Sequence, residues 1–589
     1  MSRYLNPSSR PILESLESRT MLSVTVAIVG KDLVVTGDGA ADNVTINRTG
    51  ATYTVGPSSY TAMGNLKIST GGGNDMITLI DVFIGDPTTG KRANLIVDMG
   101  GGDDTLIGGH VTAAGVTVAG GDGANLTMFY KGIGSSVCDF SGSVTYTGGL
   151  GADTLRLTGA MIGKNVVCTM GDGSNTLETN VDGIVHPQIG GKLTCTGGSA
   201  NDTVSLLGGP TITGGVAATV GDGTNSITLR DALVLNPGTG KRANVRVTGG
   251  GGQDTVTLDH LNAASVTASL GAGNNWFFLQ KGVASGVSVL SGSLTVTGGA
   301  DQDLVFVTGS QVTANCTLNL GGGLNSAQTN VDGVTHPLIG GKLAYTGGAG
   351  QDTLGLTDTT IAGGVTATAG DGTNTVTMRD AEVLNPGTGK RANVTVTGRG
   401  GQDTVTLDHL DAAGVTANLG AGNNWLYLQK GLGSSVSILS GALRVTGGAD
   451  QDTMDVFGAQ IGGSATLSPG AGHNTTQIAA DGATFASIAG NLTYTGGAGV
   501  DSVTMLSGTI SGNVKLNLSG DNDNVTITGG ALTVFHGGVQ ISAGAGADGL
   551  TLQGRFDGAV RVDGGPDVDA LNAAGSLFIA GQPVVVNVP

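Results

Sequence analysis

The segment that decides the fold is GGGGQDTVTL at residues 249–258, where a glycine-rich run ends in an Asp and alternating polar and apolar residues follow. The same phrase recurs as GGLGADTLRL at 148–157, GGAGQDTLGL at 347–356 and GGAGVDSVTM at 496–505. A shorter form, such as GDGTNSITL at 221–229, stands between the long forms. Each phrase predicts a tight turn that leads into a β-strand, and we call its last Asp or Asn the anchor.

The anchors recur at short intervals through most of the chain. The series is Asp75, Asp104, Asn125, Asp153, Asn175, Asp202, Asn225, Asp254, Asn275, Asp303, Asn325, Asp352, Asn374, Asp403, Asn424, Asp452, Asn474, Asp501, Asp523, Asp548 and Asp569. The residues seven and nine positions before every anchor are apolar, so they share one face of a strand. A unit this short buries its apolar face only by stacking on its neighbours. We therefore expect an all-β fold, a right-handed parallel β-helix (β-solenoid) of about 22 coils and roughly 100 Å.

A longer repeat is superimposed on the coils. NPGTGKRANV recurs at 236–245 and 385–394, and DPTTGKRANL stands at 86–95, so six coils form one block. Residues 71–519 hold three such blocks. We expect one elongated domain with an N-terminal segment at 1–30, a repeat region at 31–519 and coils or a cap of the same solenoid at 520–589.

Composition excludes several classes of protein. The chain has 589 residues, a formal charge of −18, 108 Gly, only 13 Pro and 39% apolar residues. Collagen needs more Pro and a strict three-residue period, and disordered chains have fewer apolar residues. The acidic balance argues against nucleic acid as a partner. No run of 18 apolar residues occurs, so we expect no transmembrane segment.

The N-terminal segment contains LESRTML at residues 16–22, with LES also at 13–15. It resembles the LEPR-x-L-L motif at the start of many large bacterial surface proteins, although Ser18 and Met21 depart from that motif. The resemblance implies a secreted bacterial protein that is extracellular or on the cell surface. The alternative is a terminal tail without a targeting role.

The GGxGxD turns resemble the repeats of hemolysin-type (RTX) calcium-binding proteins. That resemblance implies Ca²⁺ held by backbone carbonyls and Asp carboxylates, and the matching metal candidates are Asp153, Asp254, Asp352, Asp501, Asp172, Asp222 and Asp371. The RTX phrase repeats every nine residues, whereas the full phrase here comes once per two coils. The alternative is a structural turn, in which Asp and Asn alternate because stacked carboxylates repel each other.

Two further sets of residues are candidates for ligand contact. Trp276, Phe278, Trp425 and Tyr427 stand at outward positions of their strands, where they would stack on a sugar or a protein partner or lie under a neighbouring loop. Lys241, Arg242, Lys390 and Arg391 stand in the TGKRAN loops, which would contact an anionic polysaccharide or an acidic molecule, or remain solvated.

A catalytic site is not expected, because the candidate groups follow the repeat. His110, His260 and His409 are equivalent in the three blocks and cannot converge on one bond. The sequence therefore favours a non-enzymatic structural protein or adhesin, with Ca²⁺ as the one cofactor considered. The expected partners are a cell-surface or matrix polysaccharide or protein, or a second copy through the apolar segment 584–588. The alternative is a polysaccharide-active β-helix enzyme, a lyase or a hydrolase.

The cysteines give a test of the coil register. Cys168 and Cys195 both stand seven residues before an anchor on successive coils, so they should stack inside the core. A disulfide and a pair of buried thiols are both compatible with that position.

Overall fold

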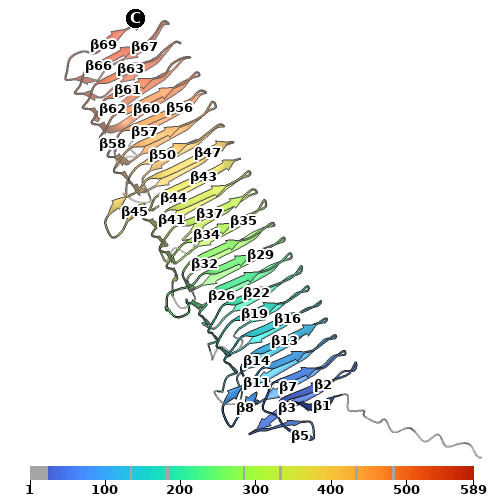
Figure 1. The fold of residues 1–589 in the computed structure, drawn as a ribbon. Helices are drawn as coiled ribbons and strands as arrows, with labels where there is room; N and C mark the ends of the chain where they lie inside the picture. The colour runs from blue at the N-terminus through green and yellow to red at the C-terminus, as the bar shows by residue number, and fades with distance from the viewer. Residues whose placement is uncertain are drawn as a thin grey trace, which may run out of the picture.

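The structure, a computed structural model, is a long rod in which the chain advances from one end to the other (Figure 1). It describes residues 24–132, 136–179, 186–282, 286–330, 335–431, 435–479 and 485–588. These residues form β-strands and turns and contain no helix, so none of them forms a helix that could cross a membrane. The expected β-solenoid is confirmed, with about 20 turns.

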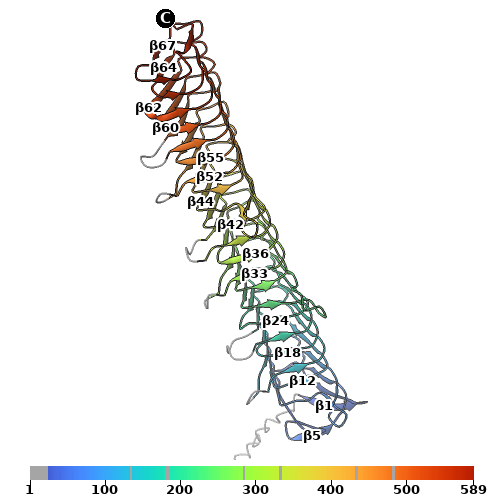
Figure 2. The same cartoon turned by 90° about the vertical axis from the view of Figure 1, so that its left-hand side faces the viewer.

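Each coil has three faces, seen from two sides in Figures 1 and 2. In a representative coil, β28 (Val245–Thr248) lies on the first face, β29 (Asp254–Asp259) on the second and β30 (Asn262–Ala263) on the third. The strands pair in parallel with the same strand of the next coil, as β28 does with β31 (Val266–Ser269). The first face is one 24-stranded sheet from β1 (Thr25–Val29) to β69 (Val584–Val586).

The core is one continuous hydrophobic column inside the coils. The apolar pair before each anchor points into it, as Val245 and Val247 show with about 1% exposure each. Phe277 and Leu279 enter the same core from β32 (Asn275–Gln280) on the second face. The prediction of an inward apolar seam is thus confirmed.

The third face was missed by the sequence analysis. Its strands are short, from β12 (Thr112–Ala113) to β42 (Thr360–Ile361), and they form an 11-stranded sheet. Two-residue strands carry too few positions for a period-two pattern, so the sequence indicates only a connection of variable length there.

The N-terminal coils depart from the regular pattern. β1 pairs antiparallel with β2 (Asp32–Thr36), so the solenoid includes residues that were assigned to the N-terminal segment. β3 (Asn43–Thr49), β4 (Thr52–Val55) and β5 (Ser58–Thr61) form an antiparallel meander. The motif at residues 16–22 lies outside the described residues. Residues 520–588 continue the sheets of the preceding coils.

The six-coil blocks carry equivalent protruding hairpins. β8 (Gly85–Asp86) pairs with β9 (Lys91–Arg92), and β45 (Leu384–Asn385) pairs with β46 (Lys390–Arg391). In the middle block, Leu235 and Arg242 form the matching antiparallel bridge. The TGKRAN segments are therefore the arms of hairpins on the rod.

The cysteines confirm the register. Cys168 in β19 (Val166–Thr169) pairs directly with Cys195 in β22 (Leu193–Thr196), and both are buried. All four cysteines of the chain are free thiols in the structure. Burial and the neighbouring Cys195 raise the pKa of Cys168, which keeps that thiol protonated.

Glycine is required where successive coils meet at the corner before the anchor. Gly121 has φ +80°, and a Cβ there would lie 1.5 Å from the carbonyl oxygen of Gly100 in the preceding coil. Gly238, in the middle hairpin, has a similar φ of +76° but open space around it.

This contrast gives a matched test of the stacking. We expect Gly121→Ala to lower the free energy of unfolding by about 1–3 kcal/mol more than Gly238→Ala, because both share the backbone strain but only Gly121 meets another coil. Denaturant unfolding followed by circular dichroism measures both. Equal effects would show that the corner does not limit coil spacing.

Candidate functional site

The anchors form a ladder of buried side chains along the corner between the first and second faces. At most anchors the backbone N–H donates to the side-chain Oδ1 of the anchor in the next coil, as from Asp153 to Asn175 at 2.9 Å and from Asn175 to Asp202 at 3.1 Å. At Asn275 and Asn474 it is the side-chain Nδ2 that reaches Oδ1 of the next anchor, and the backbone N–H donates to a backbone carbonyl. The ladder begins one coil before the predicted series, where the N–H of Asp42 donates to Asp75, and it ends with the bond from Asp548 to Asp569. The anchors therefore hold successive coils in register where the backbone turns the corner.

Asp and Asn have different roles in this ladder. The Nδ2 of Asn225 donates to the carbonyl oxygens of Gly221 and Gly223 in its own turn and to Oδ1 of Asp254 in the next coil. The Asp anchors accept instead: Oδ2 of Asp303 receives the N–H of Gly299 at 3.0 Å. Alternation thus places an amide donor beside each carboxylate, which favours the structural-turn alternative.

The seven calcium candidates separate into two groups. Asp153, Asp254, Asp352 and Asp501 are anchors, buried in the ladder with Oδ1 accepting hydrogen bonds from the preceding coil. The others, Asp172, Asp222 and Asp371, are exposed on the outer side of the corner. Oδ1 of Asp222 accepts the N–H of Gly251 from the next coil.

The structure does not gather these carboxylates around one point. Within the described ranges, no group of three or more His, Cys, Asp or Glu side chains is placed to hold a metal ion. A calcium site at these turns would have to draw most of its oxygens from backbone carbonyls. Calcium binding stays a prediction.

The ladder changes its composition at the C-terminal coils. Asp501, Asp523, Asp548 and Asp569 follow one another without an intervening Asn. The Oδ2 atoms of all four are buried and have no hydrogen-bond partner. Burial raises the pKa of Asp501 to about 6 and that of Asp523 to about 7, and the carboxylates of Asp501 and Asp548 add to the effect at Asp523.

These shifts fix the direction of the pH dependence. The folded state binds these protons more tightly than an unfolded Asp, whose pKa is 3.8. Their contribution to stability is therefore complete below pH about 4 and is lost as the pH rises through 6 to 7. We expect a higher melting temperature at pH 5 than at pH 8.

Asp523→Asn should raise the melting temperature at pH 8 by about 2 °C or more and reduce the difference between the two pH values. The amide is uncharged and is able to donate as the other Asn anchors do. Asp98→Asn is the control, because it removes one negative charge from an exposed position outside the ladder. A higher melting temperature of the wild-type rod at pH 8 than at pH 5 would refute the raised pKa values of these Asp anchors.

The aromatic candidates lie on the outer surface of the second face, as predicted. Trp276 is 41% exposed, and Phe278 is half-buried beside it. The Phe278 ring stacks on Phe306 of the next coil, with centroids 5.2 Å apart and planes at 8°. Trp276 meets Phe278 edge-on at 6.4 Å. Phe306 was not predicted from the sequence, although it lies three positions after the anchor Asp303, as Phe278 lies three positions after Asn275.

A row of planar polar groups borders the aromatic rings. Nε of Arg230 donates to Oδ2 of Asp259 at 3.0 Å, and Nε2 of Gln280 donates to Oδ1 of the same carboxylate. Because Gln280 shares β32 with Trp276 and Phe278, the row lies on the same surface as the rings. We call Trp276, Phe278, Phe306 and this row the middle platform.

The third block repeats this arrangement, which we call the third-block platform, with two changes, the first of which is Tyr427 in the position of Phe278. Arg379 and Gln429 both donate to Asp408, beside Trp425 and Tyr427 in β51 (Trp425–Gln429). The position of Phe306 is taken by Asp455, which pairs with Tyr427 in the strand register. Burial raises the pKa of Asp455 to about 6.

Fluorescence quenching tests the exposure of the two Trp residues. Trp276 is exposed and Trp425 half-buried. In Trp425→Phe, the remaining Trp276 should be quenched by acrylamide at least about twice as strongly as the remaining Trp425 in Trp276→Phe. The reverse order would mean that loops cover the middle platform.

The basic hairpins differ in how their arginines are neutralised. Arg92 makes a two-bond ion pair with Asp139, at 2.9 Å and 2.5 Å, which raises the pKa of Arg92. Arg391 makes a two-bond pair with Asp411, which likewise raises its pKa. Arg242 makes no such pair with any residue that the structure describes, and it lines an open groove instead.

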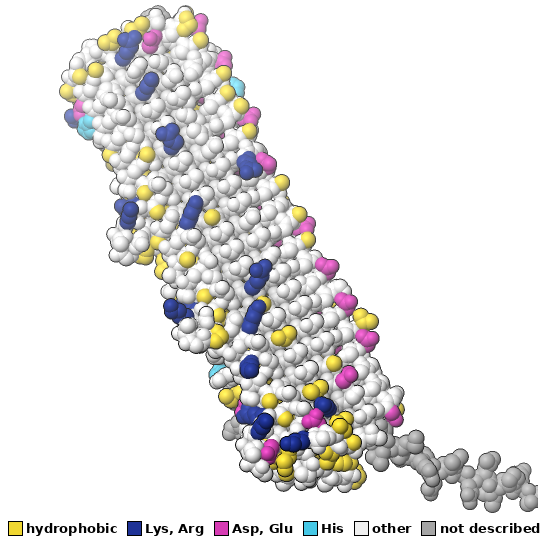
Figure 3. All heavy atoms as spheres, viewed as in Figure 1, with side chains coloured by type: hydrophobic (Ala, Val, Ile, Leu, Met, Phe, Trp, Pro, Cys, Tyr) yellow, Lys and Arg dark blue, Asp and Glu magenta, His cyan; other side chains and the backbone are white. Residues whose placement is uncertain are grey.

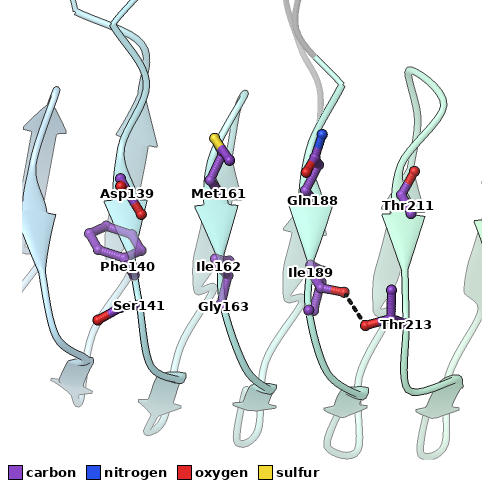
Figure 4. Close-up of a pocket in the computed structure, with 11 residues that line it drawn as sticks. Asp139, Phe140, Ser141, Met161, Ile162, Gly163, Gln188, Ile189, Thr211 and Thr213 are labelled. Carbon is purple, nitrogen blue, oxygen red and sulfur yellow. Dashed lines mark hydrogen bonds between the residues drawn. The ribbon is translucent and has the colours of Figure 1, made fainter. Parts of the chain in front are cut away.

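A shallow groove of about 220 Å³ lies on the third face (Figure 4). Asp139, Met161, Gln188 and Thr211 come from successive strands there, and Asp139 is held by Arg92. Among the lining residues Asp139 is the single carboxylate, so the groove lacks the pair that glycoside hydrolysis requires.

The histidines do not form a common site either. His110, His260 and His409 each place Nδ1 2.8 Å from an Asp of the preceding coil, Asp81, Asp231 and Asp380 respectively. These pairs repeat six coils apart along the rod, in line with the sequence analysis.

Comparison with known proteins gives no family. No protein-family model matches the chain, and a search of curated proteins finds no match.

Proposed function

We propose that this chain is a non-enzymatic structural or adhesive rod of an extracellular or cell-surface layer. The observation that carries the proposal is repetition: the hairpins, the His–Asp pairs and the two platforms recur at intervals of six coils on one continuous rod. Repeated outward features suit contact with an extended polymer or a neighbouring rod, because several weak contacts add along its length.

The interior supports a structural role. The core is continuous from Leu33 to Val562, and the anchor ladder runs through the same coils. In such an architecture each coil is stabilised by its two neighbours, which suits a stiff spacer.

The platforms are the surfaces through which such a rod would adhere. Stacked aromatic rings beside a row of Arg, Asp and Gln side chains match the flat, hydroxyl-rich faces of a polysaccharide or the polar surface of a protein. The resemblance of the N-terminal segment to surface-protein motifs supports an extracellular location.

Labelling of cells that express the chain tests this function. An antibody against the solenoid should bind intact, non-permeabilised cells or their surrounding matrix. Incubation of the purified rod with polysaccharides should release no new reducing ends or unsaturated products. Labelling that requires permeabilisation would refute the location, and chain cleavage would favour a polysaccharide-active enzyme.

A further inference from the structure

One cationic groove stands out on a rod whose formal charge is −18. It lies where the third face turns into the first face in the middle block and has a volume of about 400 Å³. Its polar lining residues are Lys192, Asn236, Arg242, Asn244 and Arg246, and no Asp or Glu lines it. We call these five residues the basic groove.

Among the described residues, the cations of the groove have no anionic partner. Lys192, Arg242 and Arg246 take part in none of the ion pairs formed by the described residues. Lys192 and Arg246 are exposed. Three uncompensated cations around one hollow are unusual in a chain with 45 acidic and 27 basic residues.

The equivalent hairpins of the other two blocks show which acids the basic groove lacks. Asp411, which neutralises Arg391, corresponds to Asn262 in the middle block, 149 residues earlier in the chain. Asp139, which neutralises Arg92, corresponds to Val289. The buried Oδ1 of Asn262 has no hydrogen-bond partner. Arg246 corresponds to Ile96 and Thr395, so the middle block gains one cation and lacks both acids.

The cations follow the rod axis. Lys164 stands just before β19, Lys192 just before β22, and Arg246 lies in β28. The strands β19, β22, β25 (Val216–Thr219) and β28 are consecutive in the first face, so this row spans about 14 Å. Figure 3 shows Lys and Arg side chains along the face of the rod, while Asp and Glu side chains gather at its edge.

We propose that the basic groove binds an acidic polysaccharide that lies along the rod axis. The guanidinium groups of Arg242 and Arg246 would each hold a carboxylate or sulfate oxygen pair, and Lys192 would contact the next anionic group. Asn236 and Asn244 offer amide donors and acceptors to sugar hydroxyls. The proposal deepens the proposed adhesive function and rests on it for where the glycan is met.

An acidic glycan fits the groove better than a nucleic acid. Duplex DNA carries one charge per about 1.7 Å and would also face the exposed Asp residues of the neighbouring corner, such as Asp172 and Asp222. A short row of cations on an acidic rod matches a polymer with about one anionic group per sugar.

Binding of the full-length rod to alginate, a carboxylated glycan, and to dextran sulfate, a sulfated one, tests the proposal. Affinity electrophoresis or calorimetry at low salt should detect binding of at least one probe, and affinity should fall as salt rises. The stronger probe identifies the anionic group. Duplex DNA is the competitor, and displacement by DNA at lower concentration than by either glycan would overturn the proposal.

Two variants and one control locate the site. Arg246→Thr and Asn262→Asp should each weaken binding by about tenfold, the loss of one charge-assisted contact. Asn262→Asp adds the acid that the third block already carries. Arg391→Gln is the control, because Arg391 is neutralised by Asp411. This variant should change the affinity by less than about twofold.

Circular dichroism and melting temperature confirm that the variants remain folded. No binding of either glycan by the wild-type rod, or equal weakening by Arg391→Gln, would overturn the groove as a site. Failure of glycan binding would not change the result of the cell-surface labelling. Conversely, antibody labelling that is confined to the interior of the cell would refute the extracellular location even if the groove bound glycan.

Discussion

The hydrogen bond from the backbone amide of one anchor to the side-chain Oδ1 of the next is the interaction on which this rod depends. Along the faces, backbone ladders join the coils without help from side chains. At the corner, the chain turns through glycines, and the buried amide of each anchor needs an acceptor, which at most anchors is the side-chain Oδ1 of the next anchor and at Asn275 and Asn474 a backbone carbonyl. Asp153 and Asn175 show how a short side chain meets this need from the coil above.

Two other features of the sequence follow from that bond. Because the coils must approach closely enough for it, glycines such as Gly121 stand where a Cβ would meet a carbonyl oxygen. Because a row of carboxylates would repel and lack donors, Asn alternates with Asp through the middle of the chain. The phrase that recurs in the sequence therefore encodes a tight corner at which each coil is hydrogen-bonded to the next.

Because the anchor side chains at the corner are buried and hydrogen-bonded to one another, the residues available for binding lie on the outer surface of the rod. Outward strand positions and the turns on either side of the third face are free to change, because the anchor ladder does not pass through them. The middle platform and the basic groove both lie at such positions. Arg230, Asp259 and Gln280 come from three successive coils, so a planar polar row is assembled by register rather than by a loop.

Residues that repeat with the coil could be placed from the sequence. The anchors, the apolar pair before them, the outward direction of Trp276 and the pairing of Cys168 with Cys195 all follow from a two-residue period and a constant offset. The third face could not be placed, because strands such as β30 are two residues long. The meander of β3 to β5 was also missed, since antiparallel pairing there interrupts the offset.

Ion pairing was beyond the sequence for a different reason. Arg92 pairs with Asp139, 47 residues away, whereas Arg391 pairs with Asp411, 20 residues away. Equivalent arginines are therefore neutralised by acids from different coils. The TGKRAN segments have nearly the same sequence. The arginines differ in their ion-pair partners, and those partners are distant residues that no local sequence pattern connects to the segments.

Duplication explains how such differences arise on a fixed scaffold. Copies of a six-coil block inherit the ladder, because a change there breaks bonds to two neighbours. Outward residues are held by no such constraint, so Asn262 and Asp411 can differ at one position while both coils keep their register. A single amide in place of a carboxylate then decides whether an arginine is closed in an internal pair or is left available to an external anion. On a rod of this kind, specificity is set by the acids that are absent as much as by the cations that are present.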